Sequence, residues 1–108
     1  MKRLIATLTF GVSLAANAEF YSGNDLLSKL NDSSVVDRMV GMGYVIGVFD
    51  VTRGIIHCPP ENITAGQVRD MVHQYLRASP SDRHLSADQH VVQVLKQNWP
   101  CAKRGQNL

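Results

Sequence analysis

Two cysteines that follow an export-type start limit most strongly what this chain of 108 residues can fold into. Lys2 and Arg3 precede a short apolar run, which ends in small residues up to Ala18. This is the pattern of a signal peptide with its cleavage site. The run is too short to span a bilayer, and no second hydrophobic segment follows it. We therefore predict a signal peptide over residues 1–18 and a single exported domain over residues 19–108.

The two cysteines, Cys58 and Cys101, are expected to form a disulfide. An oxidising compartment favours a bridge over a metal site or a catalytic thiolate. On the chain-entropy model, closing a loop of roughly 44 residues stabilises the fold by about 4 kcal/mol. The total stability of a domain this small is about 5–10 kcal/mol, so the bridge would supply a large share of it.

Charge gives little indication of a nucleic-acid or membrane-surface partner. The chain has eleven Lys and Arg against nine Asp and Glu, but two of the basic residues lie in the predicted signal peptide. The mature domain would then carry nine charges of each sign and no net charge. Such a balance does not attract polyanions, and it is compatible with specific protein association.

Capping patterns and hydrophobic periodicity predict an all-α domain, a compact bundle of about four helices. The T-x-x-Q box at Thr64 is a clear helix start, and Ser86 with Gln89 resembles a second one. Pro100 ends the last helix. The four predicted segments cover approximately residues 25–30, 35–51, 65–78 and 87–99.

The second segment can also be taken as a strand around residues 45–49. We favour a helix, because Gly43 and Gly47 lie one turn apart and would let another helix of the core approach closely. Replacing Gly47 by leucine is accordingly expected to destabilise the fold. The apolar positions that suggest helical spacing are Val35, Val36, Met39, Val40, Tyr44, Val48 and Val51.

Catalytic and metal-binding patterns do not emerge from the sequence. No two histidines share a metal-ligand spacing on one predicted helix, and there is no HExxH or CxxC motif. Surface or cap positions are expected for the histidines. Neither a nucleophile elbow nor a phosphate loop occurs. We therefore predict a protein that is not an enzyme and needs no cofactor or metal. The four histidines are His57, His73, His84 and His90.

An ordered set of short segments resembles the Rap/Tai family of immunity proteins. The segments are Gly43–Asp50, His57–Pro60, Thr64 with Gln67 and Val68, Tyr75 and Leu76, Pro80, Arg83 and His84, Ala87, and Trp99–Cys101. The resemblance implies a small helical periplasmic protein, often a homodimer, that binds a peptidoglycan-cleaving amidase effector of type VI secretion. Many relatives carry a second cysteine pair, which would fall near Leu30 and Gly41. Both positions lack cysteine here, and Leu30 is expected to fill that space.

Asp82, Arg83 and His84 are the first candidates for a partner-binding site. They lie in the turn between the last two predicted helices, where polar side chains that can donate and accept hydrogen bonds would protrude. The same residues would also suit an ordinary solvated turn. Arg53 and Glu61, in the connector that carries Cys58, are the second candidates.

The leading hypothesis is a periplasmic immunity protein that occludes its effector sterically. One alternative is a small acid-stress chaperone of the periplasm, in which histidines would respond near pH 6. Another is a diverged domain that has kept the fold but has no effector partner.

Overall fold

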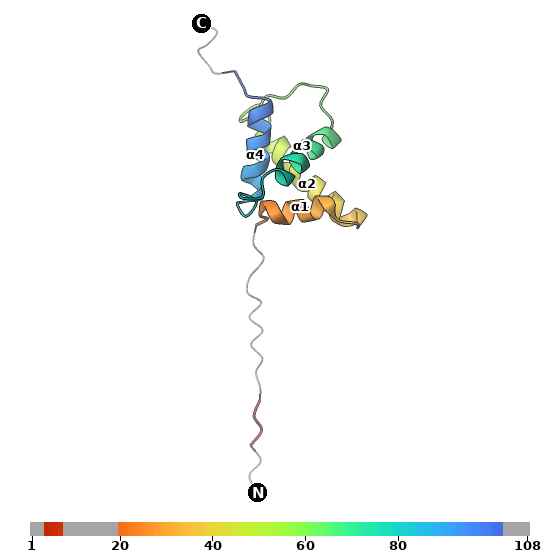
Figure 1. Ribbon diagram of the computed structural model, residues 1–108, viewed down its shortest axis with the longest axis vertical. Helices are drawn as coiled ribbons and strands as arrows, with labels where there is room; N and C mark the ends of the chain where they lie inside the picture. The colour runs from red at the N-terminus through yellow and green to blue at the C-terminus, as the bar shows by residue number, and fades with distance from the viewer. Residues whose placement is uncertain (1–3, 8–19, 103–108) are drawn as a thin grey trace.

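The computed structural model describes residues 4–7 and 20–102, and this part of the chain contains four α-helices (Figure 1). Each helix packs against the other three, so the elements form one bundle. The all-α expectation is confirmed. Apart from residues 4–7, the predicted signal peptide lies outside the described residues. The helices are α1 (Gly23–Asn31), α2 (Val35–Thr52), α3 (Ala65–Arg77) and α4 (Ala87–Asn98).

Side-chain caps define where three of the helices begin. Ser22 and Asp25 form a capping box at α1, and Thr64 and Gln67 form the expected one at α3. Ser34 caps α2 by accepting a hydrogen bond from the third helical amide. Each cap satisfies amides that the helix itself leaves free. The box expected at the start of α4 is wrong, because the Ser86 hydroxyl donates to the Asp88 carboxylate instead.

The core fills the centre of the bundle with aliphatic side chains from all four helices. α2 contributes Val45 and Phe49, which the other helices cover. The Thr52 hydroxyl is buried nearby and donates to the Val48 carbonyl at 2.7 Å, which satisfies it within the helix. The buried apolar residues are Leu26, Leu27, Leu30, Val45, Phe49, Val68, Val72, Leu76, Ala87, Val91, Val94 and Leu95.

The expected role of two α2 glycines in core packing is wrong. A Cβ added at Gly43 or Gly47 would meet no atom within 4 Å, so both face away from the other helices. Gly41 lies at the close approach instead, where an added Cβ would be 3.1 Å from Leu30 Cδ2. α1 and α2 therefore touch at the two positions, Leu30 and Gly41, that the resemblance suggested for a second cysteine pair.

The predicted disulfide is present between Cys58 and Cys101, with the two Cα atoms 4.9 Å apart. It joins the α2–α3 connector to the residue that follows Pro100, and the Cys58 amide donates to the Trp99 carbonyl at 2.8 Å. Beside it, His57 is fully buried and donates from Nε2 to the Phe49 carbonyl at 3.1 Å. The surface position expected for this histidine is therefore wrong.

Within residues 4–7 and 20–102, no helix is both long and apolar enough to cross a membrane.

Candidate functional site

The α3–α4 loop, residues 79–86, holds the first group of candidate residues and is braced from within. The Asp82 amide donates to the Ser79 carbonyl at 3.2 Å, and the Leu85 amide donates to the Asp82 carbonyl at 2.9 Å. The Ser79 hydroxyl donates back to the Tyr75 carbonyl of α3 at 2.8 Å. These consecutive turns leave the loop backbone few alternative conformations.

The start of α1 also holds this loop from outside. The amides of Gly23 and Asn24 donate to the carbonyls of Leu85 and Arg83, each at 2.8 Å. These are amides of the first helical turn, which have no partner within their own helix. In return, the Ala87 amide at the start of α4 donates to the Tyr21 carbonyl at 2.8 Å. Backbone hydrogen bonds therefore run in both directions between the start of α1 and the segment from the α3–α4 loop to the first residue of α4.

A buried histidine fixes the loop from the side of α4. His90 is 4% exposed, and its Nε2 lies 2.8 Å from the Asp82 carbonyl, to which it donates. The ring packs against Tyr75, and Gly23 lies so close that an added Cβ would come within 2.7 Å of His90 Cδ2. The expected surface position of His90 is wrong. Its place three residues after Ala87, on the apolar face of α4, is the sequence signal that could have located it.

The side chains of the loop differ in what they offer to a partner. Asp82 and His84 are exposed, and Arg83 is half-buried. The Arg83 Nε is buried and has no hydrogen-bond partner among the described residues. The ion pairs in residues 20–102 are Lys29–Asp37 and Arg69–Asp70, so Arg83 has no carboxylate partner there. A guanidinium in this state is suited to bind a carboxylate or carbonyl of another molecule.

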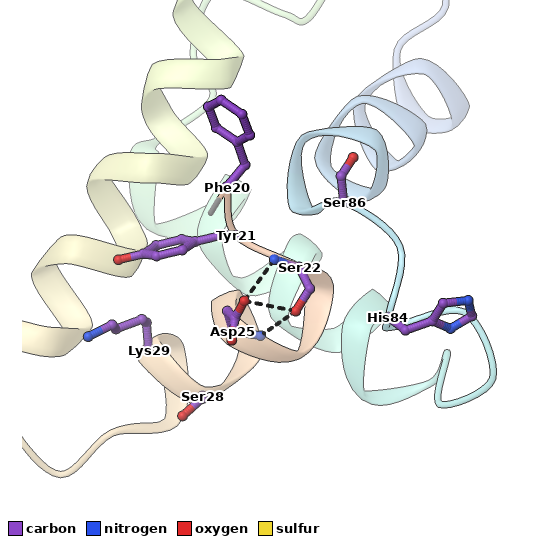
Figure 2. Close-up of a pocket in the computed structure, with 8 residues that line it drawn as sticks. All are labelled: Phe20, Tyr21, Ser22, Asp25, Ser28, Lys29, His84 and Ser86. Atoms are coloured by element: carbon purple, nitrogen blue, oxygen red, sulfur yellow. Dashed lines mark hydrogen bonds between the residues drawn. The ribbon is translucent and has the colours of Figure 1, made fainter. Parts of the chain in front are cut away.

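An open groove of about 700 Å³ lies beside the loop, between it and α1 (Figure 2). Most of its polar groups are already engaged within the protein. Asp25 accepts hydrogen bonds from Ser22 in the α1 cap, and Lys29 Nζ lies 2.9 Å from the Asp37 carboxylate. The hydrogen bond and the charge of Asp37 raise the pKa of Lys29. His84, in the same view, points away from these groups, toward solvent.

The second pair of candidates lies at the other end of the bundle. Arg53 caps the C-terminus of α2, and Glu61 lies in a turn of the α2–α3 connector, both exposed. The disulfide places this connector at the C-terminal end of α4, whereas the α3–α4 loop precedes that helix (Figure 1). The twelve residues of α4 separate the two groups by about 18 Å. The structure therefore does not bring Arg53 and Glu61 together with Asp82, Arg83 and His84.

Among the described residues, no group of three His, Cys, Asp or Glu side chains could hold a metal ion. What this site offers is a fixed backbone with polar side chains at its surface, an arrangement suited to recognition.

Comparison with known proteins gives a single family assignment. No curated protein matches the chain. A family model, described as Rap1a immunity proteins, matches residues 22–101. The match includes all four helices, the loop between α3 and α4, and both cysteines. The chain therefore belongs to the Rap1a immunity protein family.

Proposed function

We propose that the protein is a periplasmic immunity protein that binds a peptidoglycan-amidase effector of type VI secretion and blocks its catalytic groove. Membership of the Rap1a immunity family supports the general role. The observation that supports the mechanism is the α3–α4 loop, whose backbone is held by α1, by α4 and by its own turns. The proposal adds the amidase, the periplasm and the binding loop to that family role.

Inhibition by such a loop needs no chemistry from the inhibitor. A protein that fills a catalytic groove excludes the peptidoglycan substrate by occupying its place. Because the loop backbone is already ordered, little conformational entropy is lost when it binds. Asp82 would accept hydrogen bonds, while Arg83 and His84 would donate them to groups that line the groove. Arg83 is the proposed anchor, since it has no acidic partner among the described residues.

Export to the periplasm is part of the same proposal. The peptidoglycan that an amidase cleaves lies in that compartment, and disulfides persist there. The Cys58–Cys101 bridge is therefore compatible with the proposed location. Residues 1–18 are proposed to be the cleaved signal peptide, and residues 19–108 the mature domain.

The test is a binding measurement between the purified mature protein and any secreted amidase that the genes beside its own encode. Isothermal titration should give a tight complex for the wild type. Replacing Asp82, Arg83 and His84 together by alanine should weaken binding by several kcal/mol if these residues form the centre of the interface. Their side chains are outside the core, so the helical circular dichroism spectrum should stay unchanged.

The matched control replaces Arg53 and Glu61 by alanine at the opposite end of α4. We expect this variant to bind like the wild type. If only the control variant loses affinity, the connector is the binding site and the loop is not. If the wild type binds no amidase and instead co-purifies with many unrelated unfolded proteins, the chaperone alternative replaces this proposal.

A further inference from the structure

The disulfide lies at the surface of the protein. Cys58 is exposed and Cys101 is half-buried, although the bridge joins two segments that pack against the core. Structural bridges of secreted proteins normally resist reduction, whereas exposed bridges are more labile and more often regulatory. The bridge is therefore open to attack by an external thiol while the protein is folded.

An apolar groove runs beside the bridge, with a volume of about 450 Å³. Ile55, Ile56 and Pro100 form its apolar walls, and Cys101 lines it as well. Ile55 is 78% exposed, so a large aliphatic side chain stands in solvent in the same groove as a sulfur atom. Exposed apolar surface of this kind marks a place where a protein partner docks. A partner seated here would lie against the bridge.

Lys96 brings a positive charge to the same groove. It is exposed, in the last turn of α4, and it takes part in neither of the ion pairs found in residues 20–102. A nearby ammonium group favours the thiolate form of a cysteine. When the bridge opens, Lys96 can therefore stabilise Cys101 as the sulfur that leaves.

We propose that the bridge is a site of thiol–disulfide exchange with a protein dithiol, which docks on the apolar groove. A thiolate of the dithiol attacks Sγ of Cys58, the more exposed residue of the pair, and forms a mixed disulfide. The bond between Cys58 and Cys101 breaks, and its electron pair leaves on Cys101 Sγ as a thiolate. The second thiol of the dithiol loses its proton and attacks the dithiol's own sulfur in the mixed disulfide, which releases Cys58. This chain has then gained two electrons and two protons, and the dithiol has become a disulfide.

Contacts that do not involve sulfur keep the opened connector in place. The Cys58 amide donates to the Trp99 carbonyl at 2.8 Å. The buried His57 ring donates to the Phe49 carbonyl and packs against the Phe49 ring, with the two ring centroids 4.8 Å apart. The two thiols would therefore remain close together. Because the sequence has two cysteines in all, the chain can close only this bridge again. The exchange is a reversible opening of the connector, and it does not depend on the identity of the effector.

The first experiment measures reduction of the oxidised mature protein by dithiothreitol. Free thiols would be alkylated at intervals and counted by intact mass, at urea concentrations below the unfolding transition. Attack on the folded protein predicts a rate that urea leaves unchanged. If the bridge opened only through global unfolding, the rate would rise steeply with urea, because the unfolded fraction does. A rate that rises in this way overturns the proposal.

The second experiment identifies the sulfur that is attacked. Thioredoxin whose second active-site cysteine is replaced by serine serves as the probe, because it cannot resolve a mixed disulfide. Mixed with the folded protein and then alkylated, it should be found linked to Cys58, with the alkyl group on Cys101. A link to Cys101 instead contradicts the proposed order, and no adduct from the folded protein contradicts the site.

Two variants separate docking from the chemistry of the bridge. Ile55→Ser removes an apolar wall, so it should slow reduction by wild-type thioredoxin about tenfold and leave reduction by dithiothreitol unchanged. Lys96→Gln should slow both reactions about threefold, because Cys101 leaves less readily. Both residues are exposed, so circular dichroism should show an unchanged helix content.

Matched controls carry similar changes outside the groove. Val36→Ser removes an exposed aliphatic side chain from α2, and Arg77→Gln removes an exposed positive charge from the end of α3. Both should react like the wild type with either reductant. The groove is not the docking site if Ile55→Ser and the wild type are reduced by thioredoxin at the same rate. Equal rates for Lys96→Gln and the wild type would remove Lys96 from the mechanism.

Discussion

Replacing Gly23 by alanine tests the contact between α1 and the α3–α4 loop. An added Cβ would lie 2.7 Å from His90 Cδ2 and 2.8 Å from the Arg83 carbonyl oxygen. Overpacking of this kind costs about 1–3 kcal/mol. The loop must shift to relieve it, which would weaken the two α1–loop hydrogen bonds, each worth about 1 kcal/mol. We expect a total loss of about 2–4 kcal/mol, a large part of the stability of a small domain.

The assay is urea unfolding of the oxidised mature protein at low concentration, followed by far-UV circular dichroism. Gly43→Ala is the matched control, since its added Cβ meets open space. It should stabilise the fold by up to about 1 kcal/mol through helix propensity. His90→Ala should cost less stability in the Gly23→Ala background than in the wild type, because two of the three close atoms belong to that ring. The reasoning fails if Gly23→Ala is as stable as the wild type, or if both glycine variants shift stability in the same direction.

Three further predictions concern the disulfide, the α1–α2 contact and the titration of Tyr44. Replacing Cys58 and Cys101 by alanine should lower the free energy of unfolding by about 4 kcal/mol, and unchanged urea unfolding would contradict this. Leu30→Cys with Gly41→Cys should form a second bridge under oxidising conditions, detected as an intact mass lower by the two thiol hydrogens; free thiols at both sites would show that α1 and α2 do not touch there. Burial raises the pKa of Tyr44 above its ordinary value of 10.0, and the charge of Asp88 adds to this shift. The folded state therefore keeps the phenol protonated at a pH where the unfolded chain loses the proton. The resulting stabilisation is complete below pH 10.0 and is lost as the pH rises through the higher pKa of the folded state. Tyr44→Phe should remove that part of the alkaline loss in urea unfolding, and identical alkaline profiles would refute the assignment.

The helices of this fold could be predicted because local patterns and tertiary packing agree. The capping box at Thr64 and the apolar spacing of the segment that follows define α3 by themselves. The disulfide could be predicted from the two cysteines together with the predicted signal peptide. The capping box and the apolar spacing depend only on neighbouring residues, and the disulfide only on the number of cysteines. All three can therefore be recognised without knowledge of the three-dimensional fold.

The orientation of α2 could not be predicted, because periodicity identifies a buried side only when the other side is polar. Between Arg38 and Asp50, α2 carries no charged residue, and the spacing of its apolar residues fits several faces equally well. The structure buries Gly41, Val45 and Phe49 and exposes Val36 and Val40. The glycines were assigned to the wrong side for the same reason.

Only part of the candidate site was visible in the sequence. Its polar turn pointed to Asp82, Arg83 and His84, but the supports of that turn are non-local. The amides of Gly23 and Asn24 reach the loop from about sixty residues away in the chain. His90 lies on the apolar face of α4, yet its partner is a backbone carbonyl that no side-chain pattern reveals.

The central claim is that the α3–α4 loop enters and blocks an amidase, and inhibition of peptidoglycan hydrolysis tests it most directly. The purified effector would be assayed for release of peptide from isolated peptidoglycan, with increasing amounts of mature protein. Wild type should abolish hydrolysis at a stoichiometric amount, and the variant with alanine at Asp82, Arg83 and His84 should leave most of it intact. Complete inhibition by that variant, or continued hydrolysis in the presence of excess wild type, would contradict the account.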